Sequence, residues 1–296
     1  MRGRGQALFV ALAGSASVVF CWISAAAVAL VTLRRGAGEG AWLLLWALLP
    51  AVVIAWQFGD SSYIVLFAGT LALALVLRAS VSLPLTLLGS VPVGLVAGLV
   101  VLAFGDAYLE QVRSGVIEPY MTYLEQQLSR GGEAVTLPRP AASAIAGMIG
   151  VGSAVMTVLC LLLGRYWQAA LYNPGGFGDE FRSLRFPVWA TLSLVVLALV
   201  VSSAGPQWRT WAMVFMAPLT FAGLGLVHAR AQARSWSAGG LALFYVAWAL
   251  IGMVQLLVIG LAIADSWLDL RRRWGGPGSG GTKLRDPGDD EDERKL

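Results

Sequence analysis

Residues 241–264, LALFYVAWALIGMVQLLVIGLAIA, form an apolar block without a charged side chain. A helix that crosses a bilayer needs about 20 mostly apolar residues, and soluble domains rarely offer so many without interruption. Residues 7–33, ALFVALAGSASVVFCWISAAAVALVTL, form a second block of this kind. The composition agrees, because 57% of the residues are hydrophobic and only 13% are charged, whereas soluble domains have about 45–50% apolar and about 25% charged residues. The sequence therefore predicts an all-α, polytopic transmembrane helical bundle.

The apolar blocks and the breaks between them predict the number of spans. A count of about 8 spans, within a range of about 7–9, follows from the length that a span needs. The predicted spans lie near 7–33, 41–57, 62–79, 83–104, 141–165, 187–204, 208–227 and 241–264. Gly14, Ser15 and Ser17 could divide the first block into two shorter helices. We expect this block to be an uncleaved signal anchor, because its apolar run exceeds the roughly 7–15 residues of the apolar h-region of a signal peptide.

Arginine positions bear on the source and the orientation of the protein. Lys283 and Lys295 are the only lysines, and the abundant arginine, alanine, glycine, leucine and valine indicate a GC-rich bacterial genome. Arginines cluster in alternate predicted loops, which the positive-inside rule assigns to the cytoplasm. The basic N-terminus and residues 271–273 are expected there too, and the predicted spans cannot satisfy both demands. We predict a multi-pass protein of the bacterial inner membrane with both termini in the cytoplasm.

Two segments fall outside the membrane pattern. Residues 105–139 carry apolar side chains at steps of three and four residues, which predicts an amphipathic helix that lies on the membrane or caps the bundle, with a kink at Pro119. A solvated connector is the alternative. Residues 274–296 combine glycine and proline with charges of both signs and are expected to form a disordered, charged tail. The rest, residues 1–273, is expected to be one transmembrane helical domain.

Metal and catalytic chemistry have little support in the sequence. The only cysteines, Cys21 and Cys160, lie inside apolar blocks, and His228 is the only histidine. The usual histidine and cysteine ligand sets for metal ions cannot be assembled from these residues. No constellation of nucleophile and base is recognisable either. We expect no metal, no cofactor and no enzymatic activity, and no nucleic acid among the partners.

Small residues at four-residue spacing mark helix faces that can approach one another closely in lipid. They are Ala7, Ala11 and Ser15, then Ser90, Gly94 and Gly98, then Ser143 with Gly147, and Ala146 with Gly150. We expect these ridges to pack against helices of the same chain. For the ridge that begins at Ala7, the alternative is contact with a membrane coupling partner.

Residues 172–182, YNPGGFGDEFR, interrupt the apolar pattern between two predicted spans. Tyr172 and Asn173 precede Pro174, which disfavours helix in the residue before it. Gly175 and Gly176 then permit positive φ and a sharp reversal. The segment is therefore expected to end one helix and turn the chain at the membrane edge, within a loop of residues 172–187.

A short helix is expected after this turn, because Asp179 or Glu180 can cap its N-terminus. Glycine-rich turns before helices can bind phosphate. Here the two acids would repel an anion and no Walker lysine is present, so nucleotide binding is not expected. The short helix and the residues after it carry Arg182 and Arg185.

The last predicted span ends in ADSWLDLRRR. Asp265 and Asp269 are four residues apart and share one helical face, and Trp267 is typical of an interfacial anchor. One interpretation is an interfacial ion-pair stop with Arg272 and Arg273, which follow at helical spacing from Asp269. The alternative is that Asp265 binds a polar ligand or pairs with an arginine of the 172–187 loop. We predict contacts between Arg182 or Arg185 and these aspartates.

The segments RYWQAALYNPGGFGDEFRSLRFP and ADSWLDLRRR resemble a YybS-like family of uncharacterised bacterial membrane proteins. Members of this family are distantly similar to the substrate-binding S components of energy-coupling-factor vitamin transporters. In this chain, the ridge of Ala7 and Ala11 and the segment ISAAAVALVTLRRGAGEGAW carry that second similarity, although the predicted spans outnumber the six-helix core of S components. The resemblance implies no catalytic residue.

Two functions remain open from the sequence. The first is a small-molecule binding or transport subunit, similar to an S component, with a pocket among the first six or so helices. The second is a structural or assembly protein that recruits partners through its loops and has no cavity. The lipid bilayer is a partner in both. The candidate functional residues are Tyr172, Asn173, Pro174, Gly175, Gly176, Asp179, Glu180, Arg182, Arg185, Asp265, Trp267 and Asp269.

Overall fold

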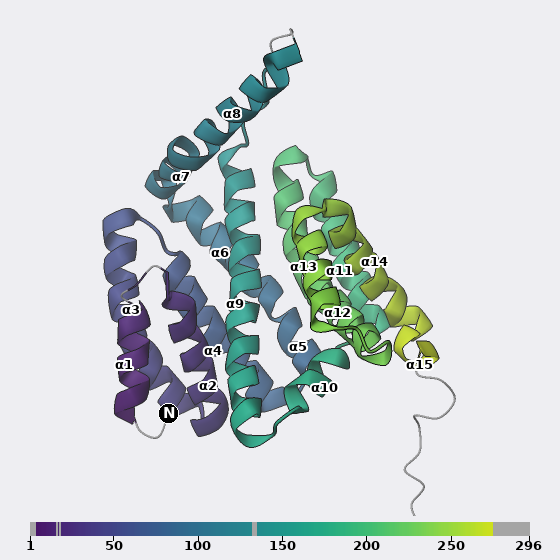
Figure 1. Cartoon of the computed structure of the whole chain (residues 1–296). Coiled ribbons are helices and arrows are strands. Elements are labelled where there is room, and N and C mark those ends of the chain that lie inside the picture. The colour runs from purple at the N-terminus through teal and green to yellow at the C-terminus, as the bar shows by residue number, and fades with distance from the viewer. Residues whose placement is uncertain (1–3, 16, 18, 132–134, 275–296) are drawn as a thin grey trace, which may run out of the picture.

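The computed structural model describes residues 4–15, 17, 19–131 and 135–274 (Figure 1). Within these residues the chain is helical and contains no strand, which confirms the all-α prediction for the described part. The predicted disordered tail lies outside the described residues, apart from Trp274. The disorder of this tail is therefore still a prediction.

The described chain forms fifteen α-helices. They are α1 (Arg4–Ser15), α2 (Cys21–Arg35), α3 (Ala37–Phe58), α4 (Ser62–Ser80), α5 (Leu83–Leu88), α6 (Ser90–Phe104), α7 (Asp106–Val112), α8 (Glu118–Leu128), α9 (Ala142–Tyr172), α10 (Gly176–Arg182), α11 (Val188–Ser203), α12 (Arg209–Ala233), α13 (Ala238–Leu250), α14 (Gly252–Leu268) and α15 (Leu270–Trp274). A π-helix, η1 (Arg113–Ile117), joins α7 to α8, and the 3₁₀ turns η2 (Ser129–Gly131) and η3 (Pro206–Trp208) follow α8 and precede α12.

Five helical segments of the described chain are long and apolar enough to cross a membrane, or six if α13 and α14 count as one bent span. The five are α3, α4, α5 with α6, α9, and η3 with α12. α11 is apolar but has only 16 residues, which is short for a bilayer core of about 30 Å. The predicted count of about 8 spans is therefore not confirmed.

The first predicted span, 7–33, is wrong as a single helix, because the chain forms a hairpin of α1 and α2 (Figure 1). The hydroxyl of Ser24 on α2 donates to the carbonyl of Val10 on α1 at 3.0 Å. Gly14 allows this approach, since a Cβ there would lie 2.2 Å from Ser24 Oγ. α1 has 12 residues and α2 has 15, so neither reaches across a bilayer core on its own. The alternative of two shorter helices is the arrangement found.

The predicted span 241–264 is also broken, since α13 and α14 meet at an angle of 108°. Ile251 between them has an extended backbone with φ −114° and ψ 102°. Such a break leaves helical carbonyls without partners. Gln255 Nε2 donates to the carbonyl of Trp248 at 3.0 Å, so a polar side chain of the same block supplies a hydrogen-bond partner for one of these carbonyls.

These two reversals bring the arginine clusters to one end of the molecule, which we call the basic end. Four contacts link the helix ends there: Arg78 Nη1 donates to the carbonyl of Leu33 at 2.8 Å, Arg34 lies over the ring of Tyr172, Arg185 pairs with Asp269, and Arg230 lies over the ring of Trp274. Helices α10 and α15 and the first turn of α1 lie at this end in Figure 1. The conflict between basic termini and basic loops disappears because the predicted single spans at 7–33 and 241–264 each double back.

At the opposite end, α7, η1 and α8 form an arm. Leu109 of α7 is buried against the bundle, whereas α8 projects away from it (Figure 1). Pro119 follows η1, where the backbone N–H of Glu118 bonds to the carbonyl of Arg113, so the expected irregularity near Pro119 takes the form of a π-helix. Val116 and Tyr120 belong to the apolar face that the sequence predicts for residues 105–139. They are 61% and 60% exposed, so this part of the face does not pack on the bundle.

The chain returns along α8 after residue 134 and is tied to it by ion pairs. Arg139 Nε lies 2.9 Å from Glu118 Oε2, and a second bond joins Arg139 to Glu125. Glu125 also accepts the backbone N–H of Leu137 at 2.8 Å. The hydrogen bond from Arg139, and then that from Leu137, hold the pKa of Glu125 below its usual value.

This tie is expected to weaken in acid. Because the pKa of Glu125 is lowered by folding, its contribution is present at neutral pH and is lost as the pH falls through the lowered pKa. Hydrogen exchange at the Leu137 amide should therefore accelerate in that acid range beyond the intrinsic pH dependence. The variant Glu125→Gln should lack this extra acceleration. If the variant shows the same extra acceleration as the wild type, the role of Glu125 in holding Leu137 is contradicted.

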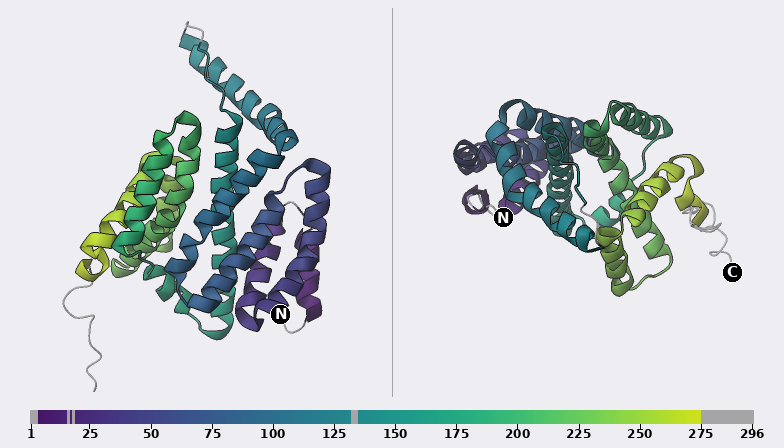
Figure 2. Two further views of the ribbon diagram at one scale, coloured as in Figure 1. Left: turned by 180° about the vertical axis from the view of Figure 1, so that it is seen from behind. Right: turned by 90° about the horizontal axis from the view of Figure 1, so that it is seen from above.

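The bundle is organised around α9, which contacts α2, α4, α6 and α12. Seen from above, α1–α4 and α11–α15 lie on opposite sides of it (Figure 2). Gly94 and Gly98 of α6 pack on α9, where an added Cβ at Gly94 would lie 2.8 Å from the carbonyl oxygen of Gly150 and one at Gly98 2.9 Å from that of Ala146. The ridge of glycines thus lets two helix backbones meet.

The first small-residue ridge is internal as well. Ala7, Ala11 and Ser15 are 7%, 0% and 1% exposed, and α1 packs on α2 and α3. These side chains therefore serve packing within the chain rather than a face for a coupling partner.

Close packing of α6 on α9 can be tested at two glycines of α9. An added Cβ at Gly150 would lie 2.6 Å from the carbonyl oxygen of Gly94, whereas at Gly152 it would meet nothing within 4 Å. Gly150→Ala should lower the free energy of unfolding by about 1–3 kcal/mol through overpacking. Gly152→Ala should be neutral or stabilising by up to about 1 kcal/mol, because alanine favours helix. Unfolding curves in detergent measure both, and equal stability of the two variants would contradict the contact.

Candidate functional site

The loop of residues 172–187 makes the sharp reversal that its sequence predicts. α9 ends at Tyr172, and Gly175 adopts the left-handed conformation with φ 89° and ψ −24° just before α10. Positive φ is found at Gly175 and not at Gly176. Gly176 instead lies against the side chain of Asn173, where an added Cβ would be 2.2 Å from the amide nitrogen. Pro174 lies between the two helices and is exposed.

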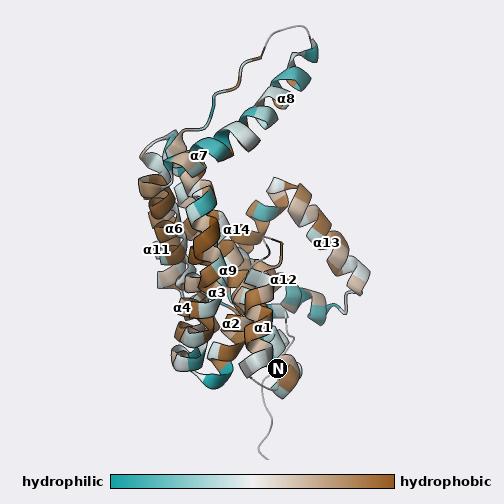
Figure 3. Cartoon of the chain, turned by 90° about the vertical axis from the view of Figure 1, so that its left-hand side faces the viewer, coloured by the Kyte–Doolittle hydropathy of each residue, from teal (hydrophilic) through white to brown (hydrophobic). Residues whose placement is uncertain are grey.

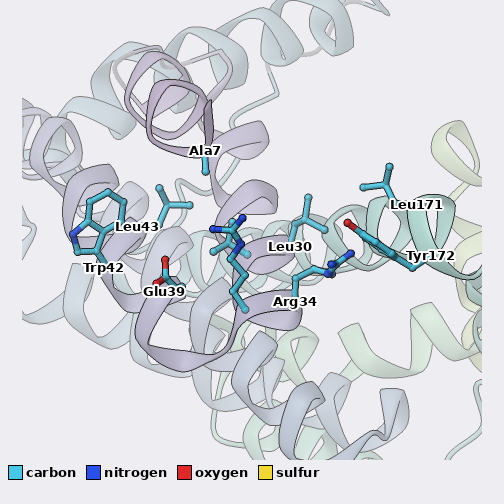
Figure 4. A pocket seen from close by; sticks show the side chains of 10 residues that line it. Ala7, Leu30, Arg34, Glu39, Trp42, Leu43, Leu171 and Tyr172 are labelled. Carbon is cyan, nitrogen blue, oxygen red and sulfur yellow. The ribbon is translucent and has the colours of Figure 1, made fainter. Parts of the chain in front are cut away.

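The two acids of the loop are both paired with arginines. Asp179 Oδ1 lies 2.6 Å from Arg182 Nη2, and Glu180 Oε2 lies 2.8 Å from Arg165 Nη2 on α9. Tyr172 is capped by a guanidinium, since Arg34 lies 3.2 Å from its ring centroid. Figure 4 shows this pair beside a small cavity of about 90 Å³ at the end of α2.

Of the predicted contacts between the loop arginines and the aspartates, the structure shows one. Arg185 Nη1 lies 3.1 Å from Asp269 Oδ2, and Arg185 Nη2 donates to the carbonyl of Ser266 at 3.1 Å. Arg182 does not reach the aspartates and pairs with Asp179 within its own helix. Trp267 lies on the surface and is 48% exposed.

Asp265 is bound by an arginine that the sequence did not single out. Arg271 Nε lies 3.1 Å from Asp265 Oδ2, and the carboxylate is only 2% exposed. Arg271 also donates to the carbonyls of Arg182, Leu184 and Ala222. Burial lowers the pKa of Arg271, and the charge of Asp265 opposes that shift. Asp265 is thus occupied by the chain itself rather than open to a ligand.

A backbone feature explains why this pair was missed. Residues six apart do not share a helical face, so Arg271 is not expected beside Asp265. Asp269 has a left-handed conformation, with φ 47° and ψ 59°, which ends α14. Asp265 Oδ1 then accepts the N–H of Leu270 at 2.9 Å, and α15 folds back. An aspartate tolerates this conformation better than most residues.

The two aspartates should differ sharply in their effect on stability. Asp265→Asn leaves Arg271 charged and buried, and breaking such a pair costs about 3–5 kcal/mol. Asp269→Asn removes a pair whose side chains are 32% and 39% exposed, worth about 1 kcal/mol or less, and asparagine retains the left-handed conformation. Denaturation in detergent measures both, and a smaller loss for Asp265→Asn than for Asp269→Asn would contradict the assignment.

A large cavity lies between α9, α10, α11, α12 and the α13–α14 pair. Its volume is about 1330 Å³, and we call it the C-terminal cavity. Most of its walls are apolar, and its polar and charged side chains are few. The lining includes Phe177, Phe181, Arg182, Leu199, His228, Tyr245, Trp248 and Gln255.

An aromatic row lines one side of this cavity. Phe177 stacks on Phe181 with 6.0 Å between ring centroids, and Phe181 meets His228 edge-on at 5.6 Å. His228 Nε2 and the hydroxyl of Tyr245 are 2.8 Å apart and share a hydrogen bond. Tyr245 in turn lies against Trp248, at 6.4 Å. The row therefore joins α10, α12 and α13.

α13 is a loosely attached wall of the C-terminal cavity. None of its residues is buried, and Leu243 and Leu250 are 70% and 79% exposed. Figure 3 shows α13 standing apart from α12. A hydrogen bond between His228 and Tyr245 ties it to α12. Sequence reasoning missed this site, because residues as far apart in sequence as Val151 and Ile263 come together only in the fold.

A second sizeable cavity, of about 740 Å³, lies at the basic end between α4, α5, α9 and α10. Among the described residues, no group of three or more histidine, cysteine, aspartate or glutamate side chains is suited to hold a metal ion. Cys21 and Cys160 are both buried.

The chain matches no family model, no curated protein and no solved structure. The resemblance to YybS-like proteins is therefore still a prediction, and the function has to be argued from the cavities themselves.

Proposed function

We propose that this protein is a multi-pass protein of the bacterial inner membrane that binds a lipid-like amphiphile in the C-terminal cavity. The observation that supports this proposal most directly is the cavity of about 1330 Å³, which has mainly apolar walls and a few polar side chains. Ligand pockets are commonly about 300–1,000 Å³ and mostly apolar, so this one has room for a large apolar ligand.

The surface supports a membrane setting. Only 17% of the apolar window of α3 is buried inside the protein, and Leu45, Leu49 and Val52 on this helix are more than half exposed. Large contiguous apolar surfaces mark contact with lipid or partners. By the positive-inside rule, the basic end faces the cytoplasm. The α1–α2 pair and the α13–α14 pair then each begin and end on the cytoplasmic side.

The C-terminal cavity has an apolar body and a polar edge. Arg182, His228 and Tyr245 form that edge, and Arg182 belongs to the loop at the basic end. An amphiphile would place its apolar part against α9, α11 and α12 and its polar group near this edge. The sparse attachment of α13 supports entry from the side of the bundle, because separating a wall without buried residues costs little burial.

This proposal keeps the small-molecule binding hypothesis and moves its site. The expected pocket was among the first helices, whereas the cavity that supports binding lies in the C-terminal half. An assembly protein without a cavity is less well supported, since that hypothesis predicts a filled bundle. Coupling to a transport partner, as in S components, stays a proposal without a structural argument of its own.

Binding in the C-terminal cavity can be tested with two tryptophan variants of α11. Leu199 lines the cavity and is 64% exposed, whereas Leu197 is 46% exposed and does not line it. Leu199→Trp should lower labelling of the purified protein in nanodiscs by a photoreactive fatty acyl probe at least about tenfold. Leu197→Trp should label like the wild type. Equal labelling of all three proteins would overturn the proposal.

A further inference from the structure

The cavity of about 740 Å³ at the basic end has a polar lining that the amphiphile site does not use, and we call it the basic-end basin. It lies where α4, α5, α9 and α10 end or begin. Its polar and charged lining residues are Arg78, Ser82, Arg165, Gln168, Tyr172, Asn173, Glu180 and Ser183. The cavity therefore gathers hydrogen-bonding groups from segments that are distant in sequence.

The basin has more positive than negative charge. Glu180 is the one carboxylate of its lining, and it pairs with Arg165 at 2.8 Å. Arg78 donates from Nη1 to the carbonyls of Thr32 and Leu33, at 3.3 and 2.8 Å, and no carboxylate of the described residues pairs with it. The basin thus carries an arginine charge that the described chain does not neutralise.

Further donors lie beside these arginines. The side-chain amides of Gln168 and Asn173 have no hydrogen-bond partner among the described residues, and both line the basin. Ser183 lies in the same wall, but its hydroxyl proton is used in a bond to the carbonyl of Glu180 at 2.9 Å. Arg34, over the ring of Tyr172, adds positive charge at the rim. Guanidinium and amide donors around a concave site suit an anion with several acceptor oxygens.

We propose that the basic-end basin binds a phosphate group, carried by an anionic lipid headgroup or by a soluble phosphate. Basic pockets between membrane helices on the cytoplasmic side bind anionic headgroups, and guanidinium groups bind phosphate through paired hydrogen bonds. The glycine turn before α10 plays no part in this site, because Asp179 and Glu180 follow it. Arg165 is the residue that binds the phosphate, and Glu180 competes with the phosphate for its guanidinium group.

This arrangement provides a matched pair of variants. Arg165→Gln and Glu180→Gln both remove the same ion pair, so their effects on folding should be alike. They differ in what they leave in the basin: the first removes a cation and the second removes the competing anion. Phosphate affinity should therefore fall at least about tenfold in Arg165→Gln and stay equal or rise in Glu180→Gln.

The measurement is the thermal unfolding midpoint of the full chain in a maltoside detergent, which contains no phosphate, titrated with inorganic phosphate or with phosphatidylglycerol. Diacylglycerol, which lacks the phosphate, is the control for the lipid, and chloride is the control for the salt. Stabilisation by inorganic phosphate identifies a soluble ligand, and stabilisation by phosphatidylglycerol alone identifies a headgroup. Either result, lost in Arg165→Gln and kept in Glu180→Gln, supports the site.

Three results would overturn it: no stabilisation by either compound, equal stabilisation by diacylglycerol, or an equal loss in both variants. Leu199→Trp separates this site from the C-terminal cavity, because Leu199 lies outside the basin. If the phosphate effect disappears in that variant, the phosphate binds in the other cavity and the basin assignment is wrong.

Discussion

The buried ion pair between Asp265 and Arg271 is the interaction on which the C-terminal half of the molecule depends. Taking two charges out of water costs several kcal/mol per ion, and such a pair persists only where further hydrogen bonds satisfy it. Here three backbone carbonyls and the N–H of Leu270 complete it. The carbonyls belong to the last residue of α10, to the α10–α11 connection and to α12, so one guanidinium joins the end of α14 to all three. Since α14 is a wall of the C-terminal cavity, the shape of that cavity rests on this pair.

α10 gives the two proposed sites a common boundary. Phe177 and Phe181 line the C-terminal cavity, whereas Glu180 and Ser183 line the basic-end basin. A helix of seven residues thus presents two aromatic side chains and Arg182 to one cavity and Glu180 to the other, and Ser183 follows directly after it. Gly225 of α12 allows this helix to lie close, because an added Cβ there would be 2.5 Å from the carbonyl of Phe181. The loop with the most distinctive sequence in the chain is therefore the element that separates an apolar site from a charged one.

Two helical hairpins reconcile the arginine distribution with a membrane. Each of α1, α2 and α13 is shorter than a bilayer core requires, at about 1.5 Å per residue. Hairpins of short helices return the chain to the end from which it came, so the arginines of α2, α4, the 172–187 loop, α12 and α15 can share the basic end, whereas Arg113 and Arg139 belong to the arm at the opposite end. Backbone groups freed at the breaks need partners in an apolar setting, and Gln255 supplies one for Trp248.

How much the sequence predicts varies with the range of the interaction. Helical structure, the apolar outer faces and the reversal at Gly175 follow from composition and local conformational preference, which act within a few residues. The division of 7–33 into two helices was only an alternative, because glycine and serine permit a break without requiring one; the contact between Ser24 and Val10 decides it. The contact of Arg185 with Asp269 could be inferred from complementary charges.

By itself, the sequence determined that the described part of the chain is helical and rich enough in apolar surface for a membrane, with a sharp reversal after α9. Only the tertiary structure decided which arginine neutralises Asp265, how often the chain doubles back and where cavities lie. The physical reason is that a left-handed residue at Asp269 and a 108° bend redirect the chain in ways that helical spacing does not encode. Cavities arise from the packing of whole helices, so their position cannot be read from any one segment.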